Sequence, residues 1–182
     1  VRPEFGGAHE CAGTPNALVS FGESYLELLA PDPNQPEPAG ERPFAVTTTM
    51  EPAMVAFAVR PGPGETIEDL VEAMRSAGHD PGDPFAMSRS APGGVELSWR
   101  LTLPKLTRGG VVPFLLDWGD TPHPASTVVG GVGLVELRGQ SPEADLVNGI
   151  LTAIGFDPFV TDGAIGLAAT VRSDAGADPV DL

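Results

Sequence analysis

The sequence predicts an α+β protein that repeatedly uses a βαβββ unit, in which one strand and one helix precede three further strands. Repetition of this unit would form a curved mixed sheet, an open trough with the helices on its outer face. Two apolar strands that end in arginine, at residues 54–60 and 133–138, each precede an amphipathic helix. Each helix leads into a similar exit, Gly-His-Asp-Pro at 78–81 and Gly-Phe-Asp-Pro at 155–158. The two prolines lie 77 residues apart and the two arginines 78 residues apart, which indicates an internal repeat.

The first helix is predicted from apolar residues at helical spacing between two boundary signals. Thr66 stands at the N-cap position, Glu68 and Asp69 fall in the first turn, and Gly78 follows the end. The apolar stripe consists of Ile67, Leu70, Val71 and Met74.

The second helix shows the same kind of boundaries. Ser141 is predicted as the N-cap, Pro142 as the first helical residue, and Gly155 as the residue that ends the helix. Its apolar stripe consists of Leu146, Val147, Ile150, Leu151 and Ile154.

The repeat divides the chain into three expected modules that together form one unit. Residues 1–50 are an incomplete first module, because one repeat of 78 residues before Pro81 falls at Pro3, where the helix of that module should end. Its opening strand and helix are therefore expected to precede Val1, and the chain does not begin with methionine. Residues 51–127 are a complete second module, and residues 128–182 a partial third. Residues 5–13 are a glycine-rich stretch before the first expected strand, and proline-rich residues 31–42 read as an exposed loop. Strands are expected at 16–21, 25–30, 85–90, 95–103, 111–118, 159–161 and 165–171.

Charge and composition exclude some classes of partner. The formal net charge of −15 and the lack of a Lys/Arg cluster disfavour nucleic acid, and the longest apolar runs are too short to span a bilayer. Cys11 is the single cysteine, so there is no internal disulfide framework. We therefore expect a cytoplasmic protein whose partner is a small molecule.

Several short segments then occur in an order typical of a known family. They are Gly-Gly-Ala-His at 6–9, Gly-Thr-Pro-Asn-Ala-Leu at 13–18, Tyr-Leu-Glu-Leu at 25–28, Ala-Pro-Asp-Pro at 30–33, Met-Ser-Arg at 87–89 and Pro-Phe-Leu-Leu-Asp-Trp at 113–118, followed by His123 and Pro124. In these segments, which cover most of residues 1–125, the chain resembles the glyoxalase-like domain of the vicinal-oxygen-chelate superfamily.

The resemblance implies a divalent metal (zinc, nickel, manganese or iron) at the centre of the trough, held by the first and last strands of two paired modules. The last-strand ligands fall on Glu27 and near Asp117, and His9 is a further candidate. The first-strand position of the second module falls at Ala56 and Phe57, which cannot bind metal, and that of the first module precedes the chain. Since at most two of four ligands are visible, a metal-free trough is the equal alternative.

Glu27 and Asp117 are the expected catalytic residues. Because side chains alternate along a strand, Glu27 points opposite to its leucine neighbours, toward the trough if these face the helices. It is then a ligand or general base, or else a solvated glutamate on an open sheet face. Asp117 ends the most apolar strand and is either a second site acid or the cap of the turn at Gly119 and Asp120.

The remaining candidates are expected to contact the substrate. Trp99 and Trp118 serve as walls for a planar ligand, or else as core residues. Arg89 either orients a substrate carboxylate or forms an ion pair with Glu27 or Asp117. The other two candidates are Asn16 and His123.

Two functions follow from these assignments. The first is a metal-assisted isomerase, lyase or dioxygenase that acts on a small oxygenated molecule. The second is a metal-free protein that binds or sequesters such a molecule. An incomplete first module would expose a sheet edge, so we also expect a homodimer.

Overall fold

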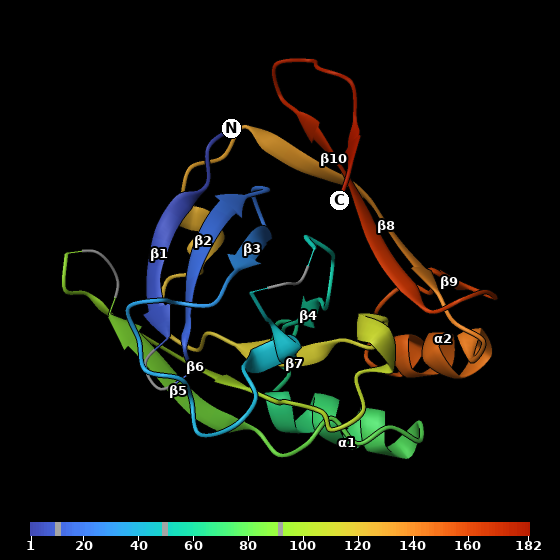
Figure 1. Ribbon diagram of the computed structural model, residues 1–182. Coiled ribbons are helices and arrows are strands. Elements are labelled where there is room, and N and C mark those ends of the chain that lie inside the picture. The colour runs from blue at the N-terminus through green and yellow to red at the C-terminus, as the bar shows by residue number, and fades with distance from the viewer. Residues whose placement is uncertain (10–11, 49–50, 91–92) are drawn as a thin grey trace.

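The computed structural model describes residues 1–182 except 10–11, 49–50 and 91–92. Two α-helices and three open sheets form the α+β architecture that the sequence predicts, with mixed and antiparallel pairing (Figure 1). In the part of the chain that the structure describes, no helix is long and apolar enough to cross a membrane.

The first sheet contains β1 (Glu4–His9), β2 (Thr14–Ser20) and β3 (Tyr25–Leu29), all antiparallel. The sequence predicted β2 and β3, but β1 lies in the glycine-rich stretch, where no strand was predicted. A register shift between Phe5 and Gly7 interrupts its pairing with β2, which is how a strand accommodates this composition.

The second sheet has the order β4-β7-β6-β5 and follows a βαβββ path along the chain. It contains β4 (Ala58–Val59), β5 (Phe85–Ser90), β6 (Glu96–Leu101) and β7 (Phe114–Asp117). β4 runs parallel to β7, and the other pairs are antiparallel. The strand predicted at 54–60 is therefore two residues long, because only Ala58 and Val59 have ladder partners.

Helix α1 (Ile67–Ser76) begins and ends where the sequence predicts. Thr66 and Asp69 form a reciprocal capping box, in which the Thr66 hydroxyl accepts from the Asp69 amide and the Asp69 carboxylate accepts from the Thr66 amide. Gly78 follows the helix with a φ of 87°, the left-handed conformation that glycine adopts without strain.

The third sheet has the order β11-β10-β8-β9, and the second helix lies against β9. It contains β8 (Val132–Gln140), β9 (Val160–Thr161), β10 (Gly166–Ser173) and β11 (Val180–Asp181). The element order along the chain repeats that of the second sheet, but β9 pairs directly with β8, so the strand order differs. β11 was not predicted.

Helix α2 (Ala144–Ala153) starts later than the sequence predicts. The hydroxyl of Ser141 does accept from the Glu143 amide, but this contact closes a turn before the helix, and Glu143 is the N-cap. Ser141 was therefore wrong as the N-cap, since its own backbone amide bonds to Thr161 beside β9 and holds it outside the helix.

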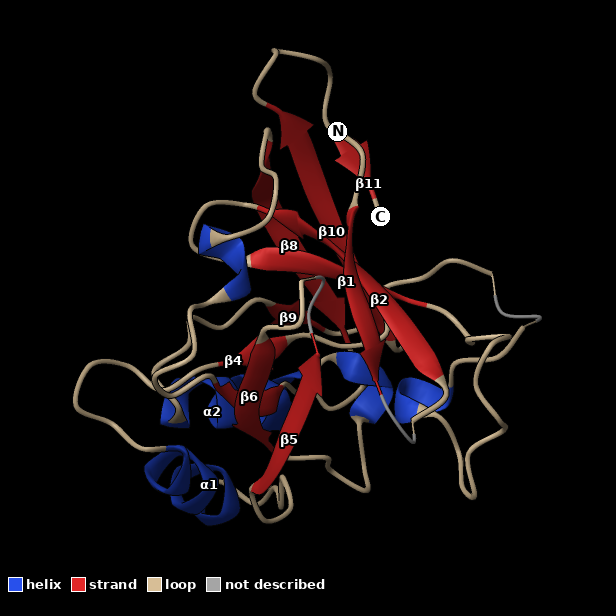
Figure 2. Cartoon of the chain, turned by 90° about the vertical axis from the view of Figure 1, so that its left-hand side faces the viewer, coloured by secondary structure: helices blue, strands red, loops and turns tan. Residues whose placement is uncertain are grey.

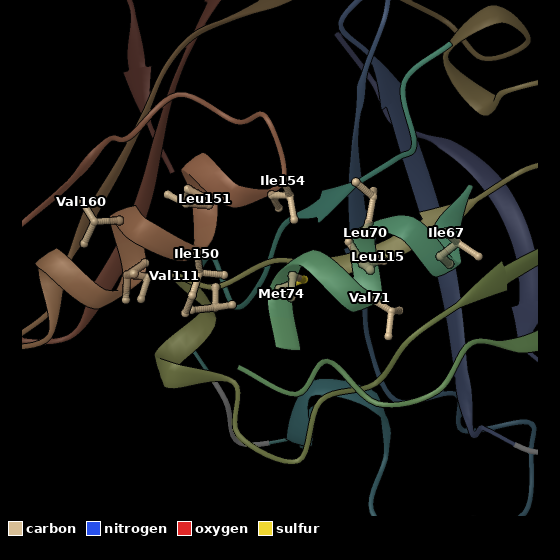
Figure 3. Packing of buried hydrophobic residues seen from close by; sticks show 12 residues of the cluster. Ile67, Leu70, Val71, Met74, Val111, Leu115, Ile150, Leu151, Ile154 and Val160 are labelled. Carbon is tan, nitrogen blue, oxygen red and sulfur yellow. The ribbon is translucent and has the colours of Figure 1, made fainter. Parts of the chain in front are cut away.

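The main hydrophobic core lies where α1, α2 and β7 meet (Figure 3). Leu115 of β7 packs there with both predicted helical stripes and is fully buried. Members of this cluster are Ile67, Leu70, Val71, Met74, Val111, Val112, Leu115, Val147, Ile150, Leu151, Ile154 and Val160. Burial of this apolar surface is the main source of stability in this half of the molecule.

The first sheet lies against the second through β1 and β5, and Figures 1 and 2 show β1 and β2 standing above β5 and β6. Arg89 of β5 donates a hydrogen bond to the carbonyl oxygen of Gly6 in β1, which joins the two sheets at this edge. Because the first and second sheets meet at this edge, the space between their facing surfaces can form a cleft.

Candidate functional site

A cleft lies between the facing surfaces of the first two sheets. Alternate residues of each strand point into it, as the two-residue period of a strand requires. From the first sheet these are Asn16 and Leu18 of β2 and Tyr25, Glu27 and Leu29 of β3, with His9 of β1; from the second they are Met87, Arg89, Trp99, Leu101, Phe114 and Leu116, followed by Trp118.

Aromatic contacts close the cleft at its sides. The rings of His9 and Trp99 meet edge to face across the two sheets, with centroids 6.3 Å apart. Phe44, in the turn Pro43–Ala45, lies 5.3 Å from the ring of Phe114. The enclosed volume between the walls is about 80 Å³, and the cleft is open to solvent at its mouth.

A chain of hydrogen bonds forms the polar end of this cleft. The side-chain amide of Asn16 donates to Glu27 Oε1 at 2.7 Å and lies 3.3 Å from His9 Nε2. The other ring nitrogen of His9 is 3.1 Å from the hydroxyl of Thr14, which is fully buried. Asn16 therefore fixes the positions of Glu27 and His9 at once.

Burial keeps His9 uncharged. Loss of solvation lowers the pKa of the His9 imidazole, the Glu27 carboxylate opposes this shift, and the Arg89 guanidinium adds to it. When His9 is neutral and accepts from Asn16 at Nε2, its proton lies on Nδ1 and is donated to Thr14. The imidazole thus has one tautomer, which the protein selects.

Gly6 makes room for this arrangement. A Cβ at Gly6 would lie 2.3 Å from Asn16 Oδ1 and 3.2 Å from the guanidinium of Arg89. Only glycine therefore allows the Asn16 amide to lie against β1. Arg89 is 5% exposed, and burial lowers the pKa of its guanidinium while the nearby Glu27 and Tyr25 act in the opposite direction.

Tyr25 contributes a hydroxyl that stays protonated. Burial raises the pKa of the Tyr25 phenol well above its ordinary value, and the negative charge of Glu27 raises it further. The ring of Tyr25 also meets the His123 ring at 5.3 Å. Tyr25 lines the cleft as a neutral phenol.

Asp117 lies outside the lining of this cleft. Phe114 and Leu116 of β7 point into it, so strand alternation turns Asp117 to the opposite side, beside Arg100 in the sheet register. Its carboxylate accepts from the Gly119 amide at 2.9 Å, the turn-capping alternative that the sequence left open. The structure does not bring Glu27 and Asp117 together, and Arg100 is instead paired with Glu68 of α1.

His123 lies behind Tyr25 and Trp118, which line the cleft. Its ring contacts those of Tyr25 and Trp118, and its Nδ1 accepts from the Ala125 amide at 3.3 Å, which starts the turn Pro124–Ser126. Burial lowers the pKa of the His123 imidazole, and the charge of Arg60 lowers it further. Its contact with the cleft is therefore indirect.

The donor set does not fit a resident divalent metal. His9 Nε2 and Glu27 Oε1 are 3.7 Å apart, but an amide of Asn16 lies against both atoms. Catalytic zinc sites use three protein ligands, and no group of three or more His, Cys, Asp or Glu side chains able to hold a metal occurs among the residues described here. Of the three predicted ligands, Glu27 and His9 meet, and Asp117 does not join them.

Sequence reasoning missed part of the wall. Tyr25 and Leu29 share the face of Glu27, and Leu116 shares that of Phe114, so strand alternation applied to every strand would have found them. Phe44 gave no such signal, because it lies outside the predicted strands, just after the proline-rich residues 31–42. It reaches the cleft from a left-handed backbone conformation with a φ of 56°.

Comparisons with known proteins agree with this architecture. A family model described as a glyoxalase-like domain matches residues 1–155. Among solved structures, the crystal structure of a hypothetical protein from Staphylococcus aureus superimposes with a TM-score of 0.66 at 16% identity, covering 91% of this chain and 79% of that chain. This likeness is one of fold. Among curated proteins, no relative matches significantly.

Proposed function

This chain belongs to the glyoxalase-like domain family, and we propose that its cleft binds a small oxygenated molecule. The binding uses protein side chains alone, without a resident metal ion. The unfilled hydrogen-bonding groups of the cleft carry this proposal. The indole N–H of Trp118 is buried next to the Tyr25 hydroxyl, but no hydrogen bond of regular geometry satisfies it within the described part of the chain. Glu27 keeps 30% of its side chain exposed at the other side of the cleft.

A buried polar group without a partner is costly, so a ligand that supplies the missing partner gains binding free energy. An oxygen atom can accept from the Trp118 N–H, and a hydroxyl can donate to the Glu27 carboxylate. The apolar side chains around these two groups remove the rest of the ligand from water. This combination favours a small molecule that is apolar over most of its surface and carries oxygen functions.

The two tryptophans of the sequence provide a direct test, because Trp99 and Trp118 both line the cleft. Tryptophan fluorescence of protein treated with EDTA is followed while hydroxyacetone, lactate, cyclohexanol, phenol or catechol is added. We expect at least one of these probes to change the emission in a saturable manner. The titration is repeated after addition of Zn²⁺, Ni²⁺, Mn²⁺ or Fe²⁺, and we expect the affinities to stay the same.

Glu27→Gln and Asp117→Asn form a matched pair of acid-to-amide changes. Glu27→Gln is expected to weaken binding by about tenfold or more, since a hydrogen bond to a charged acceptor is worth roughly 1.5–3 kcal/mol. Asp117→Asn, which lies off the cleft, should leave binding unchanged. Emission that no probe changes, or binding that requires metal, contradicts the proposal. An effect of Asp117→Asn as large as that of Glu27→Gln would restore Asp117 to the site.

A further inference from the structure

We infer that the ligand of this cleft is an uncharged, planar aromatic molecule with a hydroxyl group that donates a hydrogen bond to Glu27. This inference rests on the proposed function and names the chemical class of the ligand. Three properties of the cleft carry it: its aromatic walls, its charge balance, and the state of its donors and acceptors.

The walls are aromatic on both sides. Tyr25 of β3 and Phe44 of the turn Pro43–Ala45 come from the first sheet and the segment after it, and the other side carries Trp99, Phe114 and Trp118. The rings of Trp99 and Trp118 are tilted by 45° with centroids 5.1 Å apart. Aromatic rings pair favourably with other rings in offset and tilted arrangements, so a flat ring fits between these walls better than a puckered one.

The polar end of the cleft balances one negative and one positive charge. Glu27 supplies the carboxylate, and Arg89 supplies a guanidinium that bonds to the neutral carbonyl of Gly6. Both ring nitrogens of His9 are engaged by Thr14 and Asn16, so the imidazole offers the ligand no free polar atom. An anionic ligand would be repelled by Glu27 and a cationic ligand by Arg89, and either would lose solvation on entering an apolar cleft. An uncharged ligand avoids both costs.

Most donors at this end are already engaged. The Asn16 amide contacts Glu27 and His9, the Nδ1 proton of His9 bonds to Thr14, and Arg89 donates to Gly6. The second oxygen of the Glu27 carboxylate accepts no hydrogen bond from any described residue, while Oε1 is held by Asn16. Among the described residues, the buried Trp118 N–H is an unfilled donor, while Asn16 Oδ1 and the Glu27 carboxylate are unfilled acceptors. The carboxylate is the charged one, so a ligand hydroxyl gains most by donating to it.

Five probes of similar size separate these properties. Phenol is flat, neutral and a donor; anisole lacks the donor; cyclohexanol lacks the flat ring; benzoate and benzylammonium carry charge. Binding to the intact chain at neutral pH is measured by ligand-observed NMR and by tryptophan emission. We expect phenol to bind about tenfold more tightly than anisole, and about threefold more tightly than cyclohexanol, with both charged probes weaker than phenol.

Glu27→Gln provides an independent readout of the charge balance. Removal of the carboxylate leaves the charge of Arg89 unopposed, so benzoate should bind more tightly to this variant than to the wild type, while the preference for phenol over anisole shrinks. Asp117→Asn is the matched control and should keep the wild-type order of the five probes. Thermal denaturation of both variants establishes that they are folded.

The outcomes separate this inference from the proposed function. If cyclohexanol binds as tightly as phenol, or if either charged probe binds most tightly, the ligand class is wrong while a small-molecule cleft stands. If Glu27→Gln leaves benzoate binding unchanged, the charge argument is overturned. If none of the five probes, nor hydroxyacetone or lactate, perturbs the tryptophans, both fail together.

Discussion

Strand β7 lies between two regions that differ in composition, an apolar core on one face and a partly polar cleft on the other. On one side Leu115 enters the hydrophobic cluster formed with α1 and α2 and is fully buried. On the other side Phe114 and Leu116 face a cleft whose far end carries His9, Asn16 and other polar groups. Neighbouring residues of this strand thus pack in the core on one face and line the cleft on the other. Substitutions on the two faces should therefore change stability and ligand binding separately.

The two acids that the sequence analysis placed at matching strand positions, Glu27 and Asp117, illustrate the same division. Glu27 lies on the cleft face of β3 beside Asn16, whereas Asp117 lies on the opposite face of β7 and caps a turn. Both acids are preceded by apolar residues in the sequence, yet they lie in different environments in the folded protein. The face of the strand decided between them.

The largest expected effect comes from a cavity on the core side. Leu115→Ala should lower the free energy of unfolding by about 2–5 kcal/mol, because a fully buried leucine is replaced in a well-packed core. Urea denaturation measures the loss. Leu116→Ala on the cleft face is the matched control and should cost less while weakening phenol binding. Equal losses for the two variants would remove the distinction between the two faces.

Gly6→Ala tests the polar end of the cleft. The added Cβ would lie 2.3 Å from Asn16 Oδ1, so the asparagine must move and its bond to Glu27 weakens. We expect a loss of about 1–3 kcal/mol of stability, typical of overpacking, together with weaker ligand binding. Gly133→Ala in β8 is the control, because nothing lies within 4 Å of its Cβ position. Normal binding by Gly6→Ala would show that the Asn16 position is unimportant.

Thr66→Ala tests whether the core-side helix can be weakened without effect on the cleft. Loss of the side-chain cap of α1 should cost about 1 kcal/mol of stability, with an unchanged order of probe affinities. Thr66→Ser retains the hydroxyl and should recover most of the loss in thermal denaturation. Any change in the preference for phenol would indicate that α1 is coupled to the cleft.

A pH titration of stability compares the histidines of the two regions. Burial lowers the pKa of His9 in the cleft and of His79 at the exit of α1, and that of His123 behind the wall. The unfolded chain takes up protons as the pH falls through about 6.5, before the folded chain does, so stability is full above this pH and declines toward pH 5. His9→Gln and His79→Gln should each flatten part of this decline, measured by urea denaturation at several pH values. A decline that neither change reduces would assign it to other groups.

The expected homodimer and the module boundaries near residues 50 and 127 remain predictions. Analytical ultracentrifugation tests the first of them.

The amino-acid sequence by itself determined the elements whose signals are local. The capping residues around Thr66, the glycine at Gly78 and the apolar stripes of both helices specify their helices through contacts within a few residues. Alternation likewise placed Glu27 opposite its leucine neighbours. The tertiary structure alone decided that β1 pairs with β2 despite its glycines, that Asp117 turns away from the cleft, and that Phe44 closes it. These outcomes depend on which strands become neighbours and which face the helices cover, and contacts between distant segments set both.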